Sequence, residues 1–330
     1  MPNILVTGGA GYVGAALVPK LLQRGWSTRV LDLMIYGEQA LEGVRANPLL
    51  DVIRGDLRDP KAVEASMKGV DTVIHLACIS NDPSFDLDPA LGKSINFDSF
   101  RPLVEAARKA GATRFIFASS SSVYGVKPVT QQVHEDTSLD AITDYARSKV
   151  EGERILREYD SADFTTVSIR PATVCGYSPR QRLDIITNLM TNHAINRGTI
   201  KVFGGSQKRP SIHIGDMTDL YVKLVDEPAA RIRNKVWNAG WENFTADEIA
   251  NTVQAEVGGN VQIVHEPTDD PRSYHISSAR LSDELGFKPK GSTRDAVREL
   301  KAAFAAGKLP NALTDPRYFN IKMMQSLSLK

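Results

Sequence analysis

Cysteine is scarce in this chain: Cys78 and Cys175 are the only two among 330 residues. Two thiols are too few for the disulfide framework of a small secreted domain, and they form no cluster of metal ligands. An excess of charge is also missing, because forty basic residues face thirty-nine acidic ones and leave a net charge of +1. This balance argues against a protein that binds nucleic acid or an anionic membrane surface.

Long apolar runs are missing as well, since the sequence has no stretch of about eighteen apolar residues that could cross a bilayer. The N-terminal residues MPNILVTGGAG lead directly into strand-like sequence, without the basic region and apolar core of a signal peptide. The apolar fraction of 42% is ordinary for a globular chain of this length. We therefore expect a cytoplasmic protein with no metal site and with neither membrane nor nucleic acid as a partner.

The first half of the chain alternates short apolar runs with stretches of helical period. Helical periodicity is clearest in ALVPKLLQRG (16–25) and FRPLVEAARKAG (100–111). Strands that alternate with helices in this way predict an α/β fold, with a doubly wound parallel sheet covered on both faces. The expected strands are 3–8, 28–33, 51–56, 71–77, 114–120 and 164–170.

After Arg170 the pattern changes to loops rich in proline, glycine and arginine, followed by further helices. We interpret residues 1–170 as one domain, which the chain re-enters at about 212–240. Residues 171–211 and 241–330 then form a smaller C-terminal region that closes over the strand ends, with a less regular tail beyond about 308. The helices expected there and at the re-entry are 184–197, 216–226, 245–257, 278–285 and 293–306.

The first strand ends in TGGAGYVG (7–14), where Gly8, Gly11 and Gly14 are spaced as in Rossmann-type dinucleotide sites. Glycine lets the backbone turn sharply and approach a pyrophosphate, and the next helix directs its N-terminal N–H groups at the phosphates. A bland tight turn explains many isolated matches to this pattern. Here the motif follows a strand and opens a helix, which favours the dinucleotide interpretation.

Two aspartates end the next strands. Asp32 can accept both hydroxyls of an adenosine ribose and would repel a 2′-phosphate, which favours NAD over NADP. The alternative is an ordinary aspartate at a strand end. Asp56, in RGDLRD, can meet the adenine amino group, or it can serve as the N-cap of the following helix.

The segment YARSK places Tyr145 and Lys149 four residues apart, so both lie on one helix face. A free tyrosine has a pKa of about 10, too high for a base at neutral pH. A nearby ammonium lowers that pKa, and an oxidised nicotinamide would lower it further. Tyr145 is therefore a candidate general base, although a partly exposed helix pair is the simpler alternative.

These motifs, in their order and spacing, resemble the extended short-chain dehydrogenase/reductase family over residues 3–305. Within that family the chain is most similar to nucleotide-sugar epimerases and dehydrogenases, including UDP-glucose 4-epimerase-like and GDP-heptose C4 dehydrogenase-like enzymes. Segments 170–184 and 209–217 resemble enzymes that act at C4 of activated hexoses or heptoses in surface-polysaccharide pathways. The motifs are TGGAGYVG (7–14), GDL (55–57), HLA (75–77), SSSSVYG (119–125), YARSK (145–149) and RPATVCG (170–176).

The resemblance implies roles for further residues. Ser120 matches the catalytic Ser/Thr, while Ser121 is a candidate substrate contact and the neighbouring serines are structural. The family's dehydratases carry an Asp-Glu pair where this chain has Ser121 and Ser122, so a dehydratase is not expected. Asn96 is expected to brace the backbone through its amide. The cofactor contacts implied are Gly8, Gly11, Tyr12, Val13, Gly14, Asp32, Asp56, Leu57, Leu76, Ala77 and Lys149.

Arginines dominate the expected substrate end. Arg209 matches the arginine that meets the sugar-nucleotide diphosphate, because its fork suits phosphate. Arg272 is a second candidate, or a loop ion pair. Arg180 and Arg182 can contact the diphosphate or the base, or they only pair with Asp184.

Other polar residues near the predicted site have simpler interpretations. Asn81 is a candidate sugar contact, although turn chemistry explains the sequence N-D-P without a ligand. His75 and His213 are expected to be structural. Cys78 and Cys175 are expected to be small core residues.

The function expected is an NAD-dependent nucleotide-sugar C4 epimerase that works by transient oxidation. The alternative is a C4 dehydrogenase or 4-keto-sugar reductase with net redox, and a non-catalytic NAD-sensing regulator is a remote third. The resemblance also implies a homodimer that pairs the helix after Asn96 with the helix of Tyr145.

Overall fold

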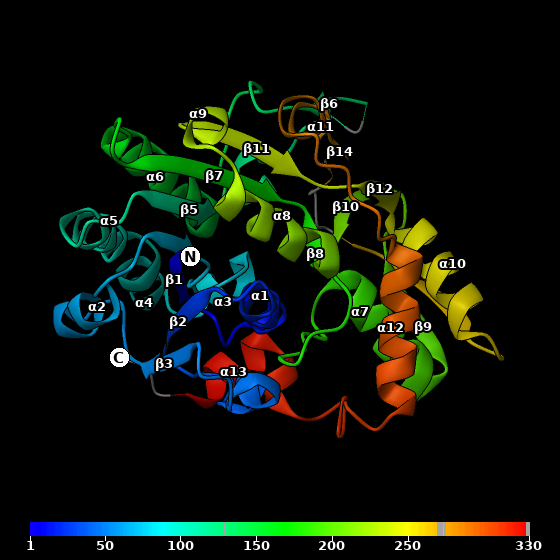
Figure 1. Cartoon of the computed structure of the whole chain (residues 1–330). Coiled ribbons are helices and arrows are strands. Elements are labelled where there is room, and N and C mark those ends of the chain that lie inside the picture. The colour runs from blue at the N-terminus through cyan, green and yellow to red at the C-terminus, as the bar shows by residue number, and fades with distance from the viewer. Residues whose placement is uncertain (129, 269–272, 274, 328–330) are drawn as a thin grey trace.

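A seven-stranded parallel sheet forms the centre of the molecule in the computed structural model, which describes residues 1–128, 130–268, 273 and 275–327 (Figure 1). The strand order is β11-β7-β5-β4-β1-β2-β3, and every neighbouring pair is parallel. The predicted fold class is confirmed. The strands are β1 (Asn3–Thr7), β2 (Ser27–Asp32), β3 (Leu50–Arg54), β4 (Thr72–His75), β5 (Arg114–Ala118), β7 (Thr165–Pro171) and β11 (Lys235–Ala239).

Each of the six predicted strands is present within three residues of its expected ends, and β11 adds a seventh at the edge beside β7. β1 and β4 are central neighbours, and the connections that follow them run to opposite halves of the sheet, to β2 and to β5. The order of the strands reverses at this point, and open α/β sheets bind ligands there.

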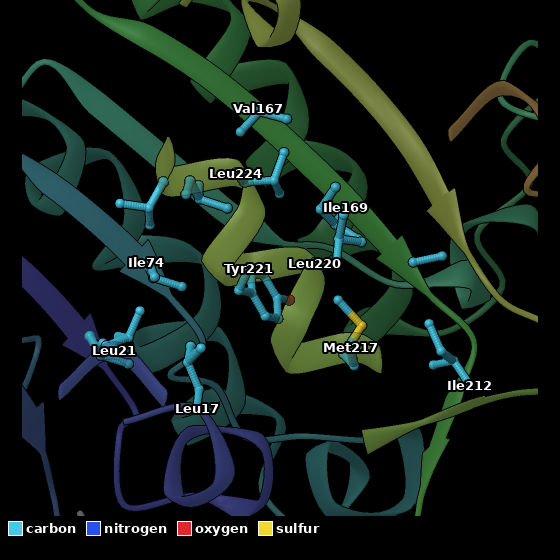
Figure 2. Close-up of a cluster of buried hydrophobic side chains, with 14 of the residues drawn as sticks. Leu17, Leu21, Ile74, Val167, Ile169, Ile212, Met217, Leu220, Tyr221 and Leu224 are labelled. Carbon is cyan, nitrogen blue, oxygen red and sulfur yellow. The ribbon is translucent and has the colours of Figure 1, made fainter. Parts of the chain in front are cut away.

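Helices cover both faces of the sheet. Leu17 and Leu21 of α1 (Tyr12–Gln23) and Leu220 of α8 (Ile214–Asp226) pack on one face against Ile74 and Val167 (Figure 2). The opposite face is covered by α2 (Pro60–Ser66), α5 (Phe100–Lys109) and α6 (Asp144–Tyr159), which enclose a second apolar cluster. The sheet is therefore buried on both sides, as its nearly continuous apolar strands predict.

Short elements connect the strand ends and form the rim of the site. The connection from β4 to α5 holds α3 (Asp82–Asp86), α4 (Pro89–Lys93) and the π-helical segment Ser94–Asp98. The remaining connections hold the 3₁₀ segments Gln39–Val44 and Ser121–Tyr124, the strands β6 (Gln132–Val133) and β14 (His275–Ile276), and the helices α9 (Ala229–Ile232) and α11 (Ala279–Leu285).

The C-terminal region packs beside the carboxyl ends of the strands, on the right in Figure 1. Capping boxes at Thr245 and Ser292 start two of its helices, because each side chain accepts from the third backbone N–H while the acidic residue there bonds back. Its elements are β8 (Thr173–Cys175), α7 (Ile186–Arg197), β9 (Thr199–Phe203), β10 (Lys208–His213), β12 (Glu242–Thr245), α10 (Ala246–Val257), β13 (Gln262–Glu266) and α12 (Thr293–Ala305).

The tail after α12 returns to the sheet domain. A 3₁₀ turn (Pro316–Tyr318) leads into α13 (Asn320–Ser326), which contacts α3 and is drawn in red in Figure 1. Met324 of α13 packs with Ile79, Leu91 and Ile95. Within the described part of the chain, no helix has the length and apolar character needed to cross a membrane.

Candidate active site

A cavity of about 490 Å³ opens at the carboxyl ends of the strands, between the sheet domain and the C-terminal region. Its walls include every predicted catalytic, cofactor and substrate residue that the structure describes. Arg272 lies outside the described residues. The predicted residues in the walls are Gly8, Gly11, Tyr12, Val13, Gly14, Asp32, Asp56, Leu57, Leu76, Ala77, Asn81, Ser120, Ser121, Tyr145, Lys149, Arg180, Arg182 and Arg209.

The three spaced glycines of the glycine loop are needed for different physical reasons. Gly8 has φ +75°, and a Cβ there would lie 2.6 Å from the Ala77 nitrogen. A Cβ on Gly14 would lie 2.4 Å from the Gly8 carbonyl oxygen. On Gly11, by contrast, a Cβ would meet only that same oxygen, at 3.1 Å, among the described residues. Packing explains the first and third glycines, whereas the second leaves room for a ligand.

The N-terminus of α1 is open toward this space, because no described side chain caps it. The Tyr12 hydroxyl is turned away and donates to the Gly176 carbonyl at 2.8 Å, while Ser178 Oγ donates to the Tyr12 carbonyl at 2.7 Å. These contacts tie the glycine loop to the loop after β8. The free N–H groups of the first helical turn, with the positive end of the helix dipole, suit a phosphate.

Asp32 lies at the end of β2 and is held by the backbone. Its two carboxylate oxygens accept from the Ala10 nitrogen at 2.9 Å and the Met34 nitrogen at 2.8 Å. Burial raises its pKa, and these two hydrogen bonds act in the opposite direction. A carboxylate has about four acceptor positions, so two remain for the hydroxyls of a ribose.

Asp56 corrects one prediction. The residue that caps α2 is Asp59, whose side chain accepts from the Lys61 nitrogen, so the N-cap alternative for Asp56 is wrong. Asp56 instead accepts from the guanidinium and backbone of Arg58, which lowers its pKa despite the cost of burial. Its place in the cavity wall still permits contact with an adenine.

Tyr145, Lys149 and Ser120 meet at the end of the cavity below β5. Lys149 is 4% exposed, and its Nζ donates to the Ala118 carbonyl at 2.8 Å and lies 5.7 Å from the centre of the Tyr145 ring. The Ser120 side chain is hydrogen-bonded to the Tyr145 phenol. The structure thus brings together three groups that are separated by up to 29 positions in sequence.

The expected lowering of the Tyr145 pKa is wrong for the protein alone. Burial raises this pKa well above the ordinary value, and Cys78 and Asp82 raise it further. The hydrogen bond from Ser120 and the charge of Arg182 lower it, but to a smaller extent. Because Lys149 is bonded to a carbonyl instead of the phenol, its charge does not offset the loss of water around the ring.

A buried polar network supports the serine loop from behind. Ser119 Oγ donates to Glu153 at 2.5 Å, and Glu153 pairs with Arg170 at 2.7 Å, both partners being 4% exposed. Ser119 is therefore structural, as predicted. Ser120 lies between Ser119 and Ser122, whose Oγ is 2.9 Å from Ser120 Oγ, and Ser121 lines the cavity.

The loop after β4 fixes the start of α6. Thr143 caps this helix by accepting from the Ala146 nitrogen, and its own hydroxyl donates to Asp82 at 2.5 Å. Asn81 has φ +74° and accepts from the Ser84 nitrogen as the N-cap of α3, so turn chemistry accounts for it. Because α6 carries Tyr145 two residues after Thr143, these contacts orient the phenol.

The arginines of the opposite wall differ in their partners. Arg182 pairs with Asp184 at 2.9 Å, as one of the alternatives predicts, but its Nη2 is buried without a partner among the described residues. Arg180 instead donates to Asn320 Oδ1 at 2.6 Å. Arg209 lies on β10 beside Phe244 of β12, and it has further contacts of its own.

Histidine and cysteine side chains have mainly structural roles. His75 lies 2.7 Å from Thr7 Oγ1 among three phenylalanines, and burial lowers its pKa to about 3, so it stays neutral. His213 is the N-cap of α8, and Cys175 is buried. Cys78 is only half-buried and lines the cavity, so its assignment to the core is wrong.

Sequence reasoning missed several contributors to the cavity wall, among them Tyr36, Ser80 and Asn320. Tyr36 follows Asp32 by four residues and could have been found from the strand end. Asn320 carries no local signal, because it reaches the cavity only through the return of the tail to α3. Asn96 was correctly interpreted, since its side-chain amide bonds both backbone groups of Ile79.

These residues fit a dinucleotide. The space that Gly11 leaves, the uncapped N-terminus of α1 and the two remaining acceptor positions of Asp32 all border the cavity, after the neighbouring strands β1 and β2. They match in turn the pyrophosphate and the adenosine ribose of NAD. Tyr145 and Lys149 stand at the other end, beside the position that the nicotinamide would take.

Comparison with known proteins identifies the family. The sequence model of the NAD dependent epimerase/dehydratase family matches residues 4–240, well over half of the chain. The chain therefore belongs to this family of NAD-dependent enzymes, and NAD is its cofactor. Extended short-chain dehydrogenases/reductases, predicted from the motifs, share this fold and cofactor.

Relatives in the family catalyse different reactions. The chain is 26% identical to a putative UDP-glucose 4-epimerase of Methanocaldococcus jannaschii, over 90% of the chain and 96% of that protein. It is 28% identical to UDP-glucuronic acid decarboxylase 1 of Arabidopsis thaliana, over 92% of the chain and 69% of that protein. The crystal structure of Thermus thermophilus UDP-glucose 4-epimerase in complex with NAD superposes with a TM-score of 0.80, at 25% identity over 92% and 99% of the two chains.

Proposed function

We propose that this member of the NAD dependent epimerase/dehydratase family epimerises a nucleotide sugar at C4 by transient oxidation. The observation that carries the proposal is the meeting of Tyr145, Ser120 and Lys149 in the wall of a cavity that also fits a dinucleotide. A phenol, a hydroxyl and an ammonium in that arrangement can remove a proton from an alcohol while its carbon loses a hydride.

Each of the three side chains has a separate task. Ser120 hydrogen-bonds the reacting sugar oxygen, and Tyr145 takes the proton from that hydroxyl. Lys149, held by the Ala118 carbonyl with its Nζ 5.7 Å from the centre of the phenol ring, binds the nicotinamide ribose. Bound NAD⁺ supplies the hydride acceptor and a second positive charge, which this site needs because burial of Tyr145 disfavours the phenolate.

Epimerisation requires the same groups to work in both directions. After the C4–OH proton and hydride have left, Tyr145 holds the proton and Ser120 the carbonyl oxygen. If the keto-sugar turns over inside the cavity, the hydride returns to the opposite face and Tyr145 gives the proton back. The enzyme then ends in its starting state, with no net oxidant consumed.

The serine loop weighs against elimination of water. In the sugar dehydratases that the chain resembles, an acidic pair follows the catalytic hydroxyl, whereas Ser121 and Ser122 hold those positions here. A hydroxyl at its ordinary pKa is a poor general acid for a leaving water. The proposal therefore keeps the chemistry at C4 and ends with an alcohol.

Incubation of the purified protein with UDP-, GDP-, dTDP- and ADP-sugars, without added cofactor, tests the proposal. Inversion at C4 of one sugar, followed by chromatography or NMR, would support the epimerase. Turnover that needs stoichiometric NAD⁺ or NADH would replace it with a net dehydrogenase or reductase. Loss of carbon dioxide from a uronic acid would place the chain with the decarboxylases instead.

Two further predictions accompany this function. Arg209 is proposed to bind the diphosphate of the nucleotide sugar, since it lines the cavity on the side of the C-terminal region.

We also expect a homodimer that forms through α5 and α6 of two chains, and sedimentation equilibrium tests this expectation. A monomeric mass at micromolar concentration would contradict it.

A further inference from the structure

Arg180 is an unusual buried cation in the cavity wall. Arg180 is only 5% exposed, and its guanidinium carbon lies 3.5 Å from the centre of the Tyr36 ring. Among the described residues its guanidinium donates to the neutral amide of Asn320, and its Nε has no partner. No described carboxylate forms a direct ion pair with Arg180, since Asp184 pairs with Arg182, although Asp32 and Asp184 are near enough to interact with it electrostatically. A buried cation without a direct ion pair is costly, which points to an anionic ligand.

The surroundings of Arg180 place it at the cofactor end of the cavity. Tyr36 follows the strand that ends in Asp32, and Arg180 is close enough to act electrostatically on the Asp32 carboxylate. The loop that carries Arg180 also contacts the first turn of α1, because Ser178 Oγ donates to the Tyr12 carbonyl at 2.7 Å. Arg209, in contrast, lies on β10 in the C-terminal region. Arg180 therefore lies in the part of the cavity wall that includes Tyr36, near Asp32, although the sequence suggested a contact with the substrate.

Asn320 connects Arg180 to the C-terminal tail. Its backbone nitrogen donates to Asp184 at 2.7 Å, its Nδ2 donates to Ser80 at 2.8 Å, and its Oδ1 accepts from Arg180. The side chain is 1% exposed, and Met324 anchors the same helix in an apolar cluster below the cavity. All the polar groups of the Asn320 side chain are thus used to join the tail, the loop after β8 and the loop after β4.

We propose that Arg180 binds the pyrophosphate of the dinucleotide, and that Asn320 of the C-terminal helix positions it there. The proposal rests on the proposed function for the division between cofactor and substrate ends of the cavity. A pyrophosphate at the N-terminus of α1 has N–H donors on one side, and Arg180 supplies a cation on the other. The tail after residue 308 is then part of the cofactor site, although it lies beyond the segment that matches the family.

The first experiment measures ligand affinity instead of catalysis. Wild type, Arg180→Met and Arg209→Met are stripped of cofactor, and calorimetry follows the binding of NAD, ADP-ribose, adenosine and the nucleoside diphosphates UDP, GDP and dTDP. Arg180→Met is expected to weaken NAD and ADP-ribose by about 10- to 100-fold, the range for a charge-assisted hydrogen bond, and to leave adenosine unchanged. Arg209→Met should show the opposite selectivity, with NAD unchanged and one nucleoside diphosphate weakened.

Three outcomes would overturn the proposal. Arg180→Met could bind NAD as tightly as wild type, could lose adenosine and NAD equally, or could lose only a nucleoside diphosphate. The last result would return Arg180 to the substrate. Circular dichroism and thermal melts show whether Arg180→Met is folded. If it is unstable, Arg180→Lys takes its place. That variant keeps the charge but not the fork, so it should bind NAD with intermediate affinity.

The role of Asn320 needs a readout that general destabilisation would not produce. Asn320→Ala alone should weaken NAD about 5- to 10-fold, as expected for one lost positioning hydrogen bond. In the Arg180→Met background it should have no further effect, because its partner has been removed. Equal effects in both backgrounds would contradict a positioning role.

If no nucleotide sugar is turned over but this coupling is found, the proposed function fails while the assignment of Arg180 and Asn320 to the dinucleotide stands.

Discussion

The interior beneath the proposed catalytic residues differs from the core of the C-terminal region. Behind the serine loop, Glu153 and Arg170 form a buried ion pair that also bonds Ser119 and Tyr124. Between α7, α10 and α12 the described core is apolar, built from alanine, valine, isoleucine and methionine side chains. Both interiors exclude water, but only one of them contains charge.

The difference follows from what each interior must hold. Apolar side chains repack at small cost when neighbours shift, so they stabilise a region without fixing one geometry. A buried ion pair with satisfied hydrogen bonds is tolerated in few arrangements, because each unpaired charge is strongly penalised. The charged network therefore holds the serine loop and α6 in one relative position, on which the proposed reaction depends.

The largest expected effect concerns the reacting group itself. Tyr145→Phe removes the general base and should lower kcat by about 10²- to 10⁴-fold, as general acid–base catalysis contributes on this scale. The unfolding midpoint should hardly change, since the ring stays in place. Steady-state kinetics with the sugar identified from the panel provide the measurement, and a normal rate would remove the phenol from the mechanism.

Glu153→Gln tests the buried network. The change leaves Arg170 without its carboxylate and should reduce the free energy of unfolding by about 3–5 kcal/mol, the range for breaking a buried pair. Urea denaturation measures the loss. Arg154→Ala, an exposed residue on the same helix with partners only at the surface, is the matched control and should leave the midpoint unchanged. Equal behaviour of the two variants would show that the network does not stabilise the fold.

His75 should make the sheet domain sensitive to acid. Its pKa is lowered to about 3 in the folded protein, mainly by burial and also by Lys149, whereas the same imidazole has a pKa of about 6.5 in the unfolded chain. Below 6.5 the unfolded state binds more protons, so stability is complete above that pH and decreases as the pH falls toward 3. Between pH 8 and pH 5 the loss is about 2 kcal/mol.

His75→Asn removes this titration while offering an amide to Thr7. The variant should be less stable than wild type at pH 8, yet its stability should vary less between pH 8 and pH 5. Urea unfolding at a series of pH values gives both slopes. If wild type and variant show parallel curves, the acid sensitivity arises elsewhere.

The smallest effect is expected in the apolar core of the C-terminal region. Ile249→Val removes one buried methylene and should cost about 1 kcal/mol, without any dependence on pH. The same urea series measures it. A cost comparable to that of Glu153→Gln would mean that the two interiors are equally intolerant, which would remove the contrast between them.

Local sequence was sufficient to predict much of the fold and one wall of the site. The apolar runs marked six of the seven strands, because strands buried on both faces need nearly continuous apolar sequence. The glycine loop, Asp32 and the Tyr145–Lys149 pair could be found because each signal lies within a few residues of one strand or helix. The pKa of Tyr145 could not be predicted in the same way, since burial and the neighbouring Cys78 and Asp82 determine it.

The sequence by itself determined the parallel sheet, the glycine loop and the residues that can transfer a proton, because backbone period and motif spacing are local properties. Only the tertiary structure decided which partners the arginines have. Arg180 meets Tyr36 and Asn320 across separations of about 140 residues, and Asp56 bonds Arg58 instead of capping α2. Such contacts depend on how packed elements place side chains in three dimensions, and no local pattern records that arrangement.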